Sequence, residues 1–123
     1  MVTLAEAQAL FDRRLRAWLA EDVEGYLACW APDMVFSSPV HHAMRGREQY
    51  AALIRQSAAA IRPLRFEIKH LAVNGDVVLA EWTMAVARRT DGKEMAWDGA
   101  SACAIQGGLI SWWREYWNPA AFA

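Results

Sequence analysis

The second half of the chain carries three turn signals at similar spacing, and they constrain the fold more than any other feature. Asn-Gly and Asp-Gly pairs are strong hairpin signals because these residues tolerate the positive φ angles of tight turns. The signals are Asn74-Gly75, Asp91-Gly92 and Gly107-Gly108. They separate four runs, at residues 65–73, 77–89, 94–106 and 109–118. Three hairpins between four strands predict an antiparallel meander, whose longer strands should curl.

The first half of the chain follows a helical pattern. Thr3 and Glu6 form a capping-box pair before apolar residues at helical spacing. Asp22 can begin a second helix that Pro32 ends, and Pro63 closes a third one. The predicted elements are helices at 3–20, 23–30 and 47–60, a short strand at 34–38 and a loop at 40–46.

Helices followed by a meander predict an α+β fold, with three N-terminal helices packed on one face of a curved antiparallel sheet. The 123 residues allow a single domain, over residues 1–123. With 55% hydrophobic and 22% charged residues, the chain has the composition of a folded protein and not of a disordered one.

Charge and motif content exclude several function classes. A net charge of -1 gives no footprint for nucleic acid, and no run reaches the ~18 apolar residues of a membrane span. The N-terminal residues lack the pattern of a signal peptide, so we expect a cytoplasmic protein with reduced, buried Cys29 and Cys103. Metal-ligand spacing and a Gly-rich phosphate loop are both missing, so we expect neither a metal nor another cofactor.

Seven tryptophans are more than the core of so small a domain usually needs. Several of them should therefore line a cavity or lie at a subunit contact. An aromatic cavity with few polar groups would suit a flat, apolar small molecule. The residues expected around it are Trp18, Trp30, Phe36, Trp82, Met84, Trp97 and Trp113.

Two stretches of sequence point to a known family. Residues 36–40 (Phe-Ser-Ser-Pro-Val) and 46–48 (Gly-Arg-Glu) resemble the segment before and at the third helix of SnoaL-like proteins. Residues 108–119 resemble their final strand, and the order of elements is that of the nuclear transport factor 2-like superfamily. The resemblance implies a cone-shaped fold with a deep apolar pocket and a homodimer formed through the outer sheet face. The superfamily includes isomerases, hydrolases, cyclases, dehydratases and non-catalytic binders.

Two enzymes of this superfamily can be compared position by position. The general base and the two oxyanion-binding residues of ketosteroid isomerase, a worked example of pKa tuning, match Ser38, Arg14 and Ser101 here. None of the three keeps the side chain that the isomerase needs, so we reject that reaction by that triad. We retain all three positions as candidate ligand contacts.

Limonene epoxide hydrolase gives a similar result. Its Arg and two Asp residues match Trp82, Met84 and Glu115, and only Glu115 keeps a carboxylate. By the resemblance, Glu115 lies on the pocket side of the last strand, where nearby indoles would desolvate it and raise its pKa. It is then a candidate general acid or base. The alternative is an ion pair at the sheet rim with Arg114, Arg65 or another cation.

Three further side chains have open alternatives. His41 and His42 lie in the loop before the third helix, where one of them could act as a base beside Glu115 or both could be exposed. Arg14 lies at the edge of the apolar face of its helix, so it either reaches water or enters the cavity. Ser38 is more plausible as a hydroxyl bonded to the backbone than as a nucleophile.

These observations give one leading hypothesis and two alternatives. The leading one is a cofactor-free isomerase, hydrolase or cyclase that binds an apolar small molecule and uses Glu115 with a loop histidine, His42 first. The second is a non-catalytic module that binds a small ligand. The third is a dimeric interaction domain whose main surface is the outer sheet face.

Overall fold

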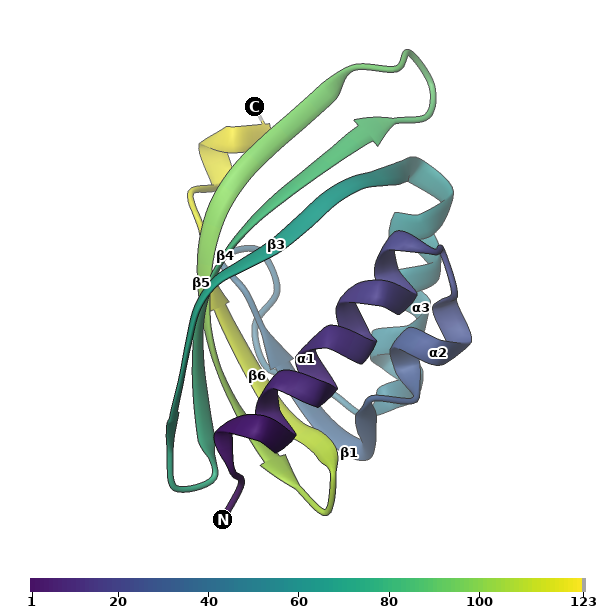
Figure 1. Ribbon diagram of the computed structural model, residues 1–123. Coiled ribbons are helices and arrows are strands. Elements are labelled where there is room, and N and C mark those ends of the chain that lie inside the picture. Colours follow the sequence, from purple (N-terminus) through teal and green to yellow (C-terminus); the bar gives the residue numbers. More distant parts are fainter. Residues whose placement is uncertain (123) are drawn as a thin grey trace.

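A computed structural model describes residues 1–122 and confirms the α+β fold, with all three helices on one side of a curved sheet (Figure 1). The meander strands are long, and the two strands on either side of the Asp91-Gly92 turn curve toward the helical side of the sheet and extend beyond the helices (Figure 1). The elements are α1 (Leu4–Leu19), α2 (Val23–Leu27), β1 (Trp30–Ser37), β2 (Met44–Arg45), α3 (Arg47–Ala60), β3 (Ile61–Asn74), β4 (Val77–Arg88), β5 (Glu94–Gln106), β6 (Leu109–Tyr116) and a final 3-10 turn η1 (Pro119–Phe122).

The sheet has six strands in the order β2-β1-β6-β5-β4-β3. Strands β3 to β6 form the predicted antiparallel meander. The sheet as a whole is mixed, because β1 pairs in parallel with β6. This pairing brings the loop after β1 beside the end of β6, two segments that are far apart in the sequence.

The helix starts follow the predicted capping. The Thr3 side chain accepts a hydrogen bond from the Glu6 amide while the Glu6 side chain accepts one from the Thr3 amide. Asp22 likewise accepts from the Gly25 amide at the start of α2. These bonds satisfy backbone donors that the first helical turn leaves free.

Three element boundaries differ clearly from the prediction, all near a proline, and the predicted loop at 40–46 contains the short strand β2. Helix α2 ends at Leu27, and β1 already begins at Trp30, so Pro32 lies inside a strand at a break in its register with β6. Strand β3 begins at Ile61, directly after α3, and includes Pro63. Since β3 is an edge strand with a register shift after Pro63, the missing N–H there costs no central ladder bond.

Three of the indoles expected around a cavity lie in the packed core instead. Trp30, Trp113 and Trp82 are 0%, 1% and 2% exposed. Trp30 packs against the rings of Tyr50 and Trp113, with centroid distances of 4.6 and 5.5 Å. Part of the tryptophan surplus is therefore used to fill the space between the helices and the sheet.

Other expectations concern the surface and the cysteines. Cys29 and Cys103 are free and buried, as expected. Within residues 1–122, none of the helices has the length and hydropathy required to span a bilayer.

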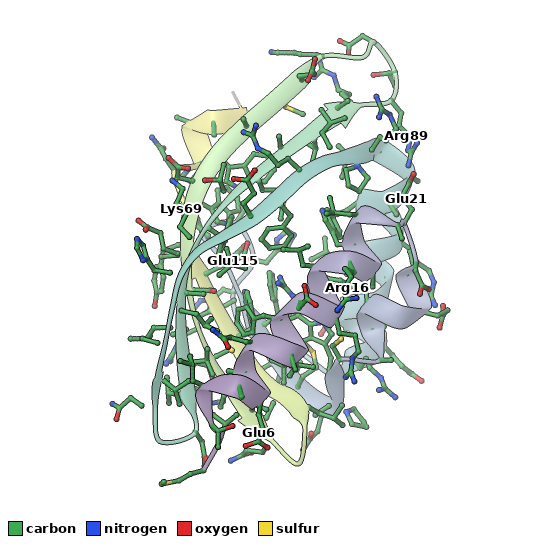
Figure 2. The ribbon with its side chains drawn as sticks, in the orientation of Figure 1. Glu6, Arg16, Glu21, Lys69, Arg89 and Glu115 are labelled. Carbon is green, nitrogen blue, oxygen red and sulfur yellow. The ribbon has the colours of Figure 1, made fainter. Side chains whose placement is uncertain are left out.

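Arg89, after β4, pairs with Glu21 at the end of α1 and donates to the Ala58 carbonyl of α3, which ties the sheet to the helices (Figure 2).

Packing of Trp82 requires a glycine on the neighbouring strand. Trp82 pairs in register with Gly99, and a Cβ on Gly99 would lie 2.6 Å from Cζ2 of the indole ring. We expect Gly99→Ala to destabilise the fold by about 1–3 kcal/mol, because the buried ring must move. Urea unfolding measures the loss. Ala96→Ser, at an exposed position of the same strand, is the control and should change stability by less than about 0.5 kcal/mol. An unchanged unfolding midpoint for Gly99→Ala would contradict this packing.

Candidate functional site

A cavity of about 450 Å³ lies between the helices and the concave face of the sheet. Its walls come from all three helices, from β1 and β3 to β6, and from the segments after β1 and β6, and they are largely aromatic and aliphatic. A volume of this size accommodates a drug-sized or smaller ligand. Its few polar side chains are therefore the places where a ligand could be recognised or changed.

The structure brings most of the predicted site residues to this cavity. Those that line it are Arg14, Trp18, Phe36, Ser38, His41, Met84, Trp97 and Glu115. Those outside its lining are Trp30, Trp82, Trp113, Ser101 and His42. Trp82 donates an indole hydrogen bond of 3.2 Å to Ser101 Oγ, and this buried pair is part of the core.

Glu115 is held at the cavity wall by two indoles of its own strand and the segment after it. Trp113 Nε1 donates to one carboxyl oxygen at 2.8 Å, and Trp117 Nε1 donates to the other at 2.7 Å. The side chain lies between the sheet and the helices, whereas Lys69 points to the outside (Figure 2). The carboxyl group is thus fixed in position by donors and faces an apolar space.

Burial raises the pKa of the Glu115 carboxyl above its ordinary value. The indole donors of Trp117 and Trp113, and the positive charges of Arg14 and His41, act in the opposite direction and limit this rise. A carboxyl group with a raised pKa can give and take a proton nearer to neutral pH.

The two cations considered as rim partners of Glu115 have other contacts. Arg65 Nε lies 3.7 Å from the Glu67 carboxylate. The Arg114 guanidinium lies 4.4 Å from the centre of the Trp112 ring on the outer face of the sheet. The contacts of Glu115 are the two indoles, and no rim ion pair forms with either arginine among the described residues.

The loop after β1 is organised around Ser38. Its Oγ accepts hydrogen bonds from the amides of Val40 and His41, at 3.2 and 3.1 Å, and its own amide donates to the His41 carbonyl. Ser38 therefore shapes a turn that leaves His41 at the cavity wall. His42 is exposed on the other side of the turn, so of the two histidines His41 is the one that can reach a ligand.

Arg14 enters the interior, which settles the alternative that its helical position left open. Its side chain is only 4% exposed, and its guanidinium lies over the rings of Trp113, Tyr26 and Phe66, with Cζ-to-centroid distances of 4.2, 5.3 and 5.3 Å. Contacts of this kind partly replace the lost hydration of a cation.

Two tyrosines of the cavity wall are absent from the residues predicted for the site. The hydroxyls of Tyr26 on α2 and Tyr50 on α3 lie 2.8 Å apart and are buried. Helical spacing alone does not distinguish such a residue from ordinary core packing. The signal that could have found them is that each helix puts a phenol, and not an aliphatic residue, at its most buried position.

Comparisons with known proteins agree with this architecture. Residues 11–113 match the SnoaL-like domain family. The chain belongs to this SnoaL-like family. No curated protein matches it in sequence.

Solved structures of similar fold carry several different descriptions. An epoxide hydrolase of the limonene epoxide hydrolase type from Mycobacterium tuberculosis is 22% identical, with a TM-score of 0.82 and coverage of 95% of this chain and 86% of that one. A putative isomerase from Bacillus subtilis is 20% identical, with a TM-score of 0.88 and coverage of 98% and 92%. A putative polyketide cyclase from Xanthomonas campestris is 18% identical, with a TM-score of 0.82 and coverage of 96% and 94%. At these identities the similarity establishes the SnoaL-like fold and not a reaction.

Within residues 1–122, no three His, Cys, Asp or Glu side chains come together as a metal-binding group. The SnoaL-like cavity instead offers a single carboxyl, Glu115, and a single guanidinium, Arg14, on its walls. The arrangement can therefore move a proton or bind a polar group of a mostly apolar molecule.

The raised pKa of Glu115 predicts how stability changes with pH. The native state holds this proton more tightly than the unfolded chain does, so the free energy of unfolding should fall as pH rises from the ordinary value of 4.5 through the raised pKa. Glu115→Gln removes this titration. Relative to wild type, the variant should therefore gain stability as pH rises from the ordinary value of 4.5 through the raised pKa.

Urea unfolding at stepped pH measures this difference, and a carbon-13 NMR titration of the Glu115 carboxyl checks the group directly. A difference between variant and wild type that stays constant with pH would show that burial does not raise this pKa.

Proposed function

We propose that this SnoaL-like protein binds a flat, mostly apolar small molecule in its cavity and that Glu115 exchanges a proton with it. The activity would be a cofactor-free isomerisation, cyclisation or hydrolysis that proceeds by acid–base chemistry. The observation that carries the proposal is the Glu115 carboxyl, which faces an aromatic cavity while two indole N–H groups fix its position.

The geometry supports Glu115 as a general base or acid in the following way. Each carboxyl oxygen accepts one indole bond and keeps a second lone pair for a ligand proton. The two indole bonds hold the group in one orientation, which lowers the cost of aligning it with a reacting C–H or O–H. His41, on the same cavity, is the second titratable side chain that could exchange a proton with the ligand.

A proton-transfer assay tests the proposal without a known substrate. Ring ketones with and without a carboxylate substituent would be incubated with the protein in D2O, and exchange of their α-hydrogens would be followed by NMR. Wild type should accelerate exchange of at least one compound, and Glu115→Gln should reduce that acceleration by about 10²–10⁴-fold.

The matched control is Glu81→Gln, which changes an exposed carboxylate on the outer face of the sheet and should leave the exchange rate unchanged. Equal exchange rates for Glu115→Gln and wild type would remove Glu115 from the chemistry.

A second candidate is a binding module without catalysis. It is favoured by the use of the Ser38 hydroxyl in a turn and of Ser101 in a core hydrogen bond, which leaves few groups free for chemistry. Tight binding of a ring compound that wild type does not exchange or convert would favour this second function.

We also propose that a second copy of the chain covers the outer face of the sheet. Apolar side chains there are exposed on β4 and β6, the two strands that flank β5, with Leu79 50% and Tyr116 60% accessible. Small residues, Ala100 and Ala102, lie between them and allow close approach of another sheet. Charged pairs such as Lys69 with Asp98 flank this apolar strip.

Sedimentation velocity tests this assembly. Wild type should sediment as a dimer at micromolar concentration, and Leu79→Lys with Tyr116→Lys should sediment as a monomer, because the new charges would be buried against each other. Leu19→Lys, on the helical side, is the control and should remain dimeric. Monomeric wild type would refute the proposed dimer.

A further inference from the structure

The guanidinium of Arg14 is a buried charge without an ionic partner. Among residues 1–122 no carboxylate oxygen lies within 4.0 Å of it, and its Nε and Nη1 atoms have no hydrogen-bond acceptor. The side chain is 4% exposed and lines the cavity. Burial of an unpaired ion costs desolvation free energy. Packing alone therefore does not explain why an arginine lies at this position.

Aromatic contacts compensate for only part of this charge. The three ring faces around Arg14 attract the cation and the Tyr26 hydroxyl interacts with it, but Nε and Nη1 are left without an acceptor. The Glu115 carboxyl lines the same cavity and attracts Arg14 electrostatically, yet neither of its oxygens lies within 4.0 Å of the guanidinium. Among the described residues the charge of Arg14 is therefore only partly compensated.

The groups near Arg14 are also donors. Trp18, one helical turn after Arg14, has a buried indole N–H without an acceptor. The hydroxyls of Tyr26 and Tyr50 form one hydrogen bond with each other, and this uses one of their two protons. The helical wall of the cavity thus has more hydrogen-bond donors than acceptors and carries a positive charge.

We propose that the natural ligand of this cavity carries one carboxylate, which binds Arg14, on a flat and apolar ring system. A carboxylate matches the planar guanidinium in charge and geometry. A single guanidinium among aromatic walls fits one negative charge and not a polyphosphate. This inference rests on the proposed use of the cavity for a small molecule and defines the chemical class of that molecule.

The test compares 2-naphthoate with 2-naphthamide, its neutral isostere, by isothermal titration calorimetry. Wild type should bind the naphthoate at least tenfold more tightly than the amide. Arg14→Met should abolish this preference by weakening the binding of the naphthoate, and a cooperative urea unfolding transition reports that the variant is folded. Arg14→Lys should keep part of the preference, because it keeps the charge.

Arg13→Met is the matched control, since Arg13 is the neighbouring arginine of α1 but is exposed and outside the cavity lining. It should retain the full preference for the naphthoate. Equal binding of both compounds by wild type would overturn the carboxylate inference while leaving the cavity function in place. A preference that persists in Arg14→Met would also overturn it, and binding of neither compound would refute both the inference and the proposed use of the cavity.

Discussion

The interior of this molecule depends on a mismatch in length between its strands and its helices. Strands β3, β4 and β5 have 14, 12 and 13 residues, whereas α1, the longest helix, has 16. At about 3.3 Å per strand residue and 1.5 Å per helical residue, β3 is close to twice as long as α1. The helices therefore cover only part of the curved sheet. The remaining space is either filled by aromatic side chains or left open as a cavity.

Both outcomes occur in different parts of the same interior. Trp30 and Trp113 fill the part of the interior where β1 pairs with β6 and α3 packs against them. The cavity opens on the side of Met84 and Trp97, which belong to the strands that extend beyond the helices. Glu115 lies between these regions: one of its indole donors, Trp113, belongs to the core and the other, Trp117, lines the cavity. The core thus supports the polar group that the cavity exposes.

Local sequence signals were enough to predict the elements, and the misses have physical causes. The Gly-containing turns and the Thr3 and Asp22 caps act through their own backbone, so they could be found without tertiary information. Pro32 and Pro63 were read as helix terminators, although an edge position or a break in register also accommodates a proline in a strand. The parallel pairing of β1 with β6 depends on contacts between distant segments, which no local pattern encodes.

The candidate site was predictable to a similar extent. Alternation along the last strand placed Glu115 on one of its two faces, and the resemblance to SnoaL-like proteins implied that this face lines the pocket, where the structure has it. Alternation could not separate the indoles that line the cavity from those of the core, because both groups face inward and differ only in depth. The same limit explains why His41 could not be chosen over His42: the choice depends on the turn that Ser38 forms with the loop amides.

A ligand bound to Arg14 would also affect Glu115, the other charged group of the cavity. An anionic ligand on Arg14 would remove the positive charge that lowers the pKa of Glu115, so binding would favour the protonated carboxyl. A neutral ligand would leave that charge in place, so the pKa of Glu115 would be lower beside a neutral ligand than beside an anionic one. The charge of the ligand therefore influences how readily Glu115 gives up its proton, which links recognition by the helical wall to proton transfer at the sheet wall.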